Sequence, residues 1–206
     1  MQPDIGVTFA TVLRTLLRQD PNVILVGETR DAETAHMAIE ASMTGHLVLT
    51  SVHTNGALEA VGRLVDLGID RNAIANGLNG VLHQRLARRI CAACAEPFEY
   101  PAPTVDMLYR AGALLPGESP TLRRGRGCPT CANTGFKGRI ALYEVVVVSE
   151  AVREAITNSS DDLTVLRAAA RASNSIIEMP RYAGVLVAMG LTAPGEVLHV
   201  LQRGGG

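Results

Sequence analysis

The sequence predicts an α/β fold that includes a parallel sheet. Two short apolar runs, at residues 23–26 and 46–52, read as buried strands, because strands covered on both faces are continuously hydrophobic. A segment with helical character lies between them and ends near Gly45. Strand–helix–strand order at this spacing is typical of parallel pairing through a right-handed crossover.

The composition agrees with a globular chain of 206 residues in which 47% are hydrophobic, 19% are charged and the formal net charge is −1. That charge argues against a general nucleic-acid binder, which is usually strongly basic. The longest apolar stretch, 183–191, is too short to span a bilayer, and the first residues lack the apolar core of a signal peptide. These features predict a cytoplasmic protein.

The remaining elements follow from periodicity and breakers. Apolar residues recur at helical spacing from Phe9 to Leu17, and Asp20-Pro21 ends that helix. Asp31 is placed to cap the helix that runs to about Met43. We expect further helices at about 56–67, 71–89, 149–157, 161–172, 178–189 and 194–202, a strand at 143–148, and a disordered Gly204–Gly206 tail.

The first candidate site lies where the first strand ends. Glu28 follows Val23–Val26 closely, and ligands of α/β sheets bind beyond the carboxyl ends of the strands. A carboxylate there can orient a water molecule or hold Mg²⁺. Alone this pattern is weak, because an apolar run followed by an acid is common.

The second candidate site consists of all four cysteines of the chain, in two C-x-x-C pairs: Cys91, Cys94, Cys128 and Cys131. Two such pairs predict a closed four-thiolate Zn²⁺ site, which is structural rather than catalytic. Two disulfides or free thiols are the alternatives. Six nearby arginines add positive charge that forms either a solvated rim or a contact with acidic phospholipids: Arg85, Arg88, Arg89, Arg123, Arg124 and Arg126.

Longer blocks of sequence indicate a family. Residues 27–35 read GETRDAETA and residues 44–55 read TGHLVLTSVHTN; QRLARRIC precedes the first cysteine pair, and GCPTC and TGFKGR mark the second. With these blocks the chain resembles the ATPases of type II secretion and type IV pilus assembly, which are hexameric RecA-like motors. Residues 191–198 resemble the final helix of that family, so we expect the natural C-terminus to be present.

The resemblance implies roles for the first site. Glu28 would be the Walker B acid that polarises water for attack on ATP, with Mg²⁺ as cofactor. His46 and His53 would sense the γ-phosphate, and Arg30 would contact a phosphate or a neighbouring subunit. The plainer alternatives are structural histidines, an Arg30 paired with Asp31 or Glu33, and an Asp31 that only caps its helix.

The resemblance also implies an organisation: the C-terminal half of a RecA-like core at 1–90, a four-cysteine zinc subdomain at 91–140 and a helical subdomain at 141–206. The implied partners are a homohexamer, an inner-membrane platform protein and a cytoplasmic docking protein, at the cytoplasmic face of the inner membrane. Retraction ATPases lack the four cysteines, which favours an export role, with type II secretion slightly ahead of pilus assembly.

The sequence contains no G-x-x-x-x-G-K-[ST] phosphate-binding loop. In the family this loop precedes the Walker B strand, so we expect this chain to begin after it and to be inactive alone. The alternative function is a zinc-stabilised scaffold that binds motor subunits or membrane partners without turnover. A nucleic-acid-binding zinc ribbon is a third alternative, disfavoured by the charge and the few aromatic residues.

Overall fold

The computed structural model describes residues 9–158 and 162–203. The described chain forms two compact units, residues 1–81 with 146–176 and residues 82–145 with 177–206. The prediction for the 204–206 tail lies outside the described residues. In the described part of the chain, helices are all too short or too polar to cross a membrane.

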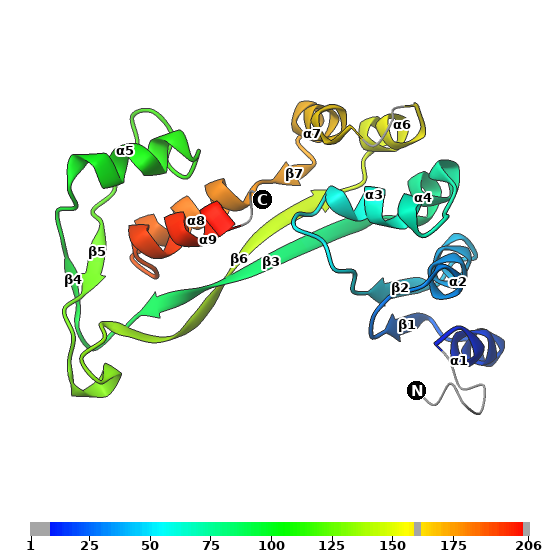
Figure 1. The fold of residues 1–206 in the computed structure, drawn as a ribbon, viewed down its shortest axis with the longest axis horizontal. Coiled ribbons are helices and arrows are strands. Elements are labelled where there is room, and N and C mark those ends of the chain that lie inside the picture. Colours follow the sequence, from blue (N-terminus) through cyan, green and yellow to red (C-terminus); the bar gives the residue numbers. More distant parts are fainter. Residues whose placement is uncertain (1–8, 159–161, 204–206) are drawn as a thin grey trace. The chain divides into compact units, whose positions relative to one another are not determined.

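The first unit begins with a helical segment and a parallel strand pair (Figure 1). Helix α1 (Phe9–Leu16) continues as a short 3-10 turn (Leu17–Gln19) and ends at Asp20, whose φ of 51° is left-handed. Strand β1 (Val23–Val26) pairs in parallel with β2 (Leu47–Thr50), and α2 (Ala32–Met43) connects them. The predicted α/β fold with a parallel sheet is therefore confirmed.

The β1–β2 pair has one covered face and one open face. Ile24 and Val26 are buried, and they cluster with Leu13 of α1 and with Met37 of α2. Both helices lie on the same side of the strands (Figure 1). The partners Val23–Leu47 and Leu25–Leu49 occupy the opposite face.

The other elements of the first unit are mostly helical and enclose a separate core. Helices α3 (Glu59–Asp66), α4 (Arg71–Gly77), α6 (Glu150–Asn158) and α7 (Leu163–Ala172) contribute to it. Its fully buried members include Leu58, Ile74 and Val152. The helices expected near 149–157 and 161–172 are confirmed over their described residues.

The helix expected at 71–89 is wrong in its second half. It stops at Gly77, and Gly80–Ile90 forms strand β3, which neighbours β6 (Phe136–Val147) in a three-stranded sheet of order β3-β6-β7, with β7 at Ile176–Ile177. Residues 84–88 favour helix locally, but pairing with the Val- and Tyr-containing strand β6 overrides that preference. Strand β6 also begins at Phe136, seven residues before the strand expected from the sequence.

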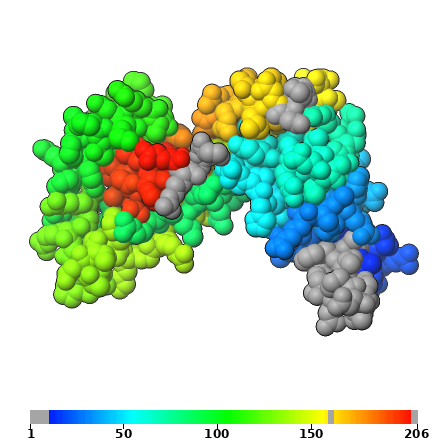
Figure 2. Space-filling view, in the orientation of Figure 1, coloured from blue at the N-terminus to red at the C-terminus, as the bar shows by residue number. Residues whose placement is uncertain are grey.

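The second unit contains the cysteines and the C-terminal helices. Its small elements are β4 (Ala95–Pro97), antiparallel to β5 (Arg123–Gly125), helix α5 (Ala102–Arg110) and a 3-10 turn at Pro129–Cys131. Helices α8 (Met179–Ala188) and α9 (Pro194–Arg203) pack on each other, and α9 also contacts α5. The red surface of α9 lies against the green surface of α5 in Figure 2.

Candidate functional site

The parallel register brings the carboxyl ends of β1 and β2 together, because Val26 pairs with Thr50. Thr29 N donates to the Ser51 carbonyl at 2.9 Å, and Ser51 Oγ donates to the Gly27 carbonyl at 2.8 Å. The Thr29 and Thr50 hydroxyls also lie 2.9 Å apart. These bonds hold the loop that carries Glu28 beside the loop that follows β2.

Glu28 and His53 meet at this edge. The Glu28 Oε1 and His53 Nε2 atoms are 3.0 Å apart, and Arg30 forms an ion pair with the same carboxylate oxygen. The Arg30 guanidinium, opposed by some burial and aided by His53, lowers the pKa of Glu28. The acid is therefore ionised at neutral pH, as a residue that orients water or a metal-bound water must be.

His46 lies elsewhere. It precedes β2, and the neighbouring Leu47 pairs with Val23, so His46 lies at the opposite end of the strands from Glu28, at least about 10 Å away along a strand. His46 Nδ1 is 3.0 Å from the Ala41 carbonyl near the end of α2. An Nδ1–H would cap that carbonyl, which matches the structural alternative for this histidine.

The acids after Arg30 have other partners. Asp31 caps α2, since its carboxylate accepts a bond from Thr34 N at 2.8 Å. Glu33 lies 3.5 Å from the Arg14 guanidinium. The cap expected at Asp31 is confirmed, and Arg30 pairs with Glu28 rather than with either of these acids.

The four cysteine sulfurs form a second cluster, within 4.8 Å of one another. The Cys91–Cys128, Cys94–Cys131 and Cys128–Cys131 sulfur pairs are 4.0, 3.9 and 3.8 Å apart. A tetrahedral zinc ion with bonds of about 2.3 Å places its sulfurs about 3.8 Å apart. The spacing fits such an ion, and all four cysteines are free rather than disulfide-bonded.

Backbone N–H groups are directed at the sulfurs. Gly127 N donates to Cys94 Sγ, and Cys128 N and Gly135 N donate to Cys131 Sγ, each at 3.3 Å. Burial opposes ionisation of Cys131, but these backbone donors outweigh it and lower the pKa of the thiol to about 6. Burial raises the pKa of the Cys94 thiol to about 11. A divalent cation would displace the remaining protons when it binds.

Sequence reasoning missed the groups that support both sites. Thr29, Thr50 and Ser51 were not singled out, although small hydroxyl residues at or near the carboxyl ends of two neighbouring parallel strands are a usable signal. Gly127 and Gly135 had no assigned role. Both have left-handed φ angles, of 97° and 77°, which glycine adopts without strain and which let their N–H groups reach the sulfurs.

The fold and the two clusters define an α/β domain with an acid at the end of a parallel strand pair and a four-cysteine module. The family model described as "Type II/IV secretion system protein" matches residues 1–198. The chain is 43% identical over 199 residues to the Type II secretion system protein E of Pseudomonas aeruginosa, covering 97% of this chain and 38% of that protein. The chain therefore belongs to the type II/IV secretion system protein family.

Another relative is the Type IV pilus assembly ATPase PilB of Thermus thermophilus, 45% identical over 156 residues, covering 76% of this chain and 17% of PilB. The solved structures of the Legionella pneumophila ATPase DotB and of the pilus retraction motor PilT share the fold, with TM-scores of 0.65 and 0.61 and identities of 23% and 24%. They cover 98% and 94% of this chain, and it covers 44% and 43% of theirs. The chain thus spans 38% and 17% of these two relatives and less than half of the two solved structures.

Proposed function

We propose that this chain is the catalytic-acid half of a secretion ATPase motor that hydrolyses ATP to drive type II secretion or type IV pilus assembly. The observation that carries the proposal is the Glu28 carboxylate, presented at the carboxyl end of β1 within 3.0 Å of His53 from the end of β2. Glu28 orients the attacking water, His53 positions Glu28, and Arg30 can exchange Glu28 for a phosphate oxygen. Mg²⁺ and ATP are the cofactors of the complete domain.

The proposal gives His46 a more distant role. Its ring lies against the end of α2, so it would act by relaying movement of that helix and not by contact with the nucleotide. His53 is the histidine on which turnover should depend most. Replacing each with alanine in a working motor separates the two roles.

The open face of the β1–β2 pair supports the view that this chain is half of a domain. Leu25 is 76% exposed and Val23 is 55% exposed, although both belong to a strand whose sequence is typical of burial on both sides. A phosphate-binding loop, which the sequence lacks, would come from the other half of the domain, which we propose also covers this face. Alone, the chain is expected to hydrolyse no ATP.

The assembly proposed for the complete motor is a homohexamer at the cytoplasmic face of the inner membrane, working with a platform protein and a cytoplasmic docking protein. In each subunit, the four cysteine thiolates bind one structural Zn²⁺ ion. Contact with acidic phospholipids would involve Arg89 and Arg126 more than Arg88 and Arg124, whose guanidinium groups pair with Glu196 and Glu96. Membership of the secretion family supports this placement.

A chimera tests the proposal directly. The matching region of the Pseudomonas aeruginosa protein is replaced by residues 1–198 of this chain, which match the family model, and ATP turnover is measured beside Glu28→Gln. Glu33→Gln is the matched control, because Glu33 is a nearby exposed acid whose carboxylate pairs with Arg14, whereas Glu28 pairs with Arg30. Turnover lost in Glu28→Gln and kept in Glu33→Gln supports the proposal.

Two results would contradict it. Equal turnover in the chimera and in Glu28→Gln would remove Glu28 from the chemistry. Turnover by the 206-residue chain alone would show that it binds ATP without an added layer. An assembled, metal-loaded chimera with no turnover would instead favour the non-catalytic scaffold.

A further inference from the structure

The cysteine cluster and the C-terminal helix α9 are joined by two sets of contacts within the second unit. Cys91 directly follows the last residue of β3, and the loop that carries Cys131 leads directly into β6. Cys91 N donates to the Gly135 carbonyl at 2.9 Å, which connects the ends of the two strands. The position of these strand ends therefore depends on how tightly the four sulfurs are held.

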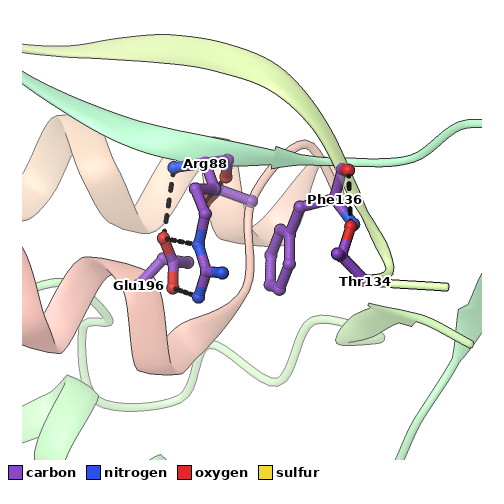
Figure 3. A network of polar contacts seen from close by, with 5 residues as sticks. Arg88, Thr134, Phe136 and Glu196 are labelled. Atoms are coloured by element: carbon purple, nitrogen blue, oxygen red, sulfur yellow. Dashed lines mark hydrogen bonds and ion pairs between the residues drawn. The ribbon is translucent and has the colours of Figure 1, made fainter. Parts of the chain in front are cut away.

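The first set of contacts centres on Arg88, near the end of β3 (Figure 3). Its guanidinium makes a two-point ion pair with Glu196, through Nε to Oε2 at 2.8 Å and through Nη2 to Oε1 at 2.5 Å. The Arg88 backbone N–H also donates to Glu196 Oε2 at 3.2 Å. The same guanidinium lies 4.2 Å from the ring centre of Phe136, the first residue of β6.

Glu196 lies in the first turn of α9. A carboxylate there favours the helix N-terminus, and its two-point pairing with a planar guanidinium fixes orientation as well as distance. The Glu196 side chain is only 16% exposed, so its pairing is less screened than that of a fully exposed acid. Arg88 and Phe136 thus anchor the first turn of α9 to the adjacent ends of β3 and β6.

The second set of contacts is made by the segment between α8 and α9. Ile90 N donates to the Leu191 carbonyl at 2.9 Å, and Thr192 Oγ1 donates to the Arg88 carbonyl at 2.8 Å. Thr192 is almost fully buried. The residue immediately before Cys91 is therefore bonded to the segment from which α9 begins.

We propose that metal binding at the four thiolates and the seating of helix α9 are coupled. A metal ion that draws the sulfurs into a tetrahedron fixes the ends of β3 and β6, which places Arg88 and Phe136 to hold Glu196. Without the ion the strand ends loosen and α9 is released before the rest of the unit. This coupling rests on the Zn²⁺ ion of the proposed function and is independent of the proposed ATP chemistry.

Release of α9 has a chemical consequence. Val197 is fully buried in the core of the second unit, and Leu198, Val200 and Leu201 pack against the same core. Loss of the metal would therefore expose an apolar helix face and the surface beneath it. The metal-bound four-cysteine module therefore holds α9 in place in addition to stabilising its own loops.

Reciprocity provides the first test, because a helix that is stabilised by the metal must in turn stabilise metal binding. Zn²⁺ affinity of the 206-residue chain is measured by competition with a chromophoric chelator. Coupling between two sites typically changes affinity by about 5–150-fold, so Glu196→Gln is expected to weaken Zn²⁺ binding about tenfold. Equal affinity in wild type and variant would overturn the proposal.

Glu118→Gln is the matched control for this substitution. Glu118 makes the same two-point ion pair, with both contacts to Arg181 at 2.7 Å, within the same unit. Its partner lies on α8 and not on β3, so its loss should change Zn²⁺ affinity by less than about twofold. If both variants weaken binding equally, the effect is general destabilisation and the specific coupling is refuted.

Hydrogen exchange of the wild-type chain supplies a test that needs no substitution. When a chelator removes the metal, the protection factors of the α9 amides are expected to fall at least about tenfold more than those of α8. Helix α8 lacks the Arg88 and Phe136 contacts that hold α9. Protection lost equally from α5, α8 and α9 would show that metal controls the folding of the whole unit, and would overturn the proposal.

Discussion

Helix α8 approaches the segment after α5 so closely that one glycine has no room for a side chain. A Cβ built on Gly184 would overlap the carbonyl group of Ala113. Gly184→Ala should therefore force the two backbones apart, whereas alanine would otherwise improve a helix by about 1 kcal/mol. Overpacking typically costs about 1–3 kcal/mol, and an overlap with backbone atoms belongs to the upper part of that range, about 2–3 kcal/mol, so the net loss after the helix gain is expected to be about 1–2 kcal/mol.

The chain offers a selective assay for this change. It has no tryptophan, and its four tyrosines are Tyr100, Tyr109, Tyr143 and Tyr182, all in the second unit. Tyrosine fluorescence during urea unfolding therefore reports that unit alone, whereas far-ultraviolet circular dichroism reports both units. With an m-value of about 2 kcal/mol/M, the expected loss lowers the fluorescence midpoint by roughly 0.5–1 M.

Gly62→Ala is the internal control. Gly62 lies inside α3 of the first unit, and nothing lies within 4 Å of the Cβ that the substitution adds. The variant should be more stable by up to about 1 kcal/mol, visible by circular dichroism and absent from the tyrosine signal. An unchanged or raised fluorescence midpoint in Gly184→Ala would refute the close approach of α8 to Ala113.

Three further predictions concern the cap, the metal and the open face. Asp31→Ala removes the N-cap of α2 and should cost about 1 kcal/mol in the circular dichroism transition, with no change in tyrosine fluorescence; an unchanged transition would contradict the cap. Zn²⁺ affinity should fall as the pH drops from 8, because protons already compete for Cys94, whose pKa burial raises to about 11, and it should fall more steeply below about 6, where the Cys131 thiolate is also lost; an affinity that does not change between pH 8 and pH 5 would exclude thiolate ligands. Leu25→Gln should leave unfolding almost unchanged and reduce aggregation, whereas Ile24→Gln on the covered face should unfold the first unit; equal effects would mean that the two faces are not distinct.

The parts of the fold that follow from local pattern could be predicted from the sequence. The strand at Val23–Val26, the Asp31 cap and the helix behind it were recognisable because apolar runs, cap residues and breakers act within a few residues. The clustering of the cysteines was predictable for the same reason, since each C-x-x-C pair forms its own turn. The metal itself stays a prediction that the sulfur spacing supports.

The parts set by distant contacts could not be predicted. Residues 84–88 resemble a helix until β6, some fifty residues later, pairs with them. Periodicity also gave no means of separating the two histidines, because their difference depends on which end of β2 faces the carboxyl end of β1. The signal that was available is Asn79-Gly80, a turn dipeptide that should have ended the helix before β3.

Under the proposed function, the open face of the strand pair and the chemistry of Glu28 depend on the same added layer. Four aliphatic side chains, Val23, Leu25, Leu47 and Leu49, are each about half exposed or more. Covering them should gain about 1 kcal/mol each, or roughly 4 kcal/mol in all, which is a large share of the stability of a small domain. A layer that binds this face would also exclude water beside Glu28, where the lower dielectric strengthens its interactions with Arg30, His53 and a bound cation. Assembly of the complete domain and activation of its acid are therefore expected to occur in one step.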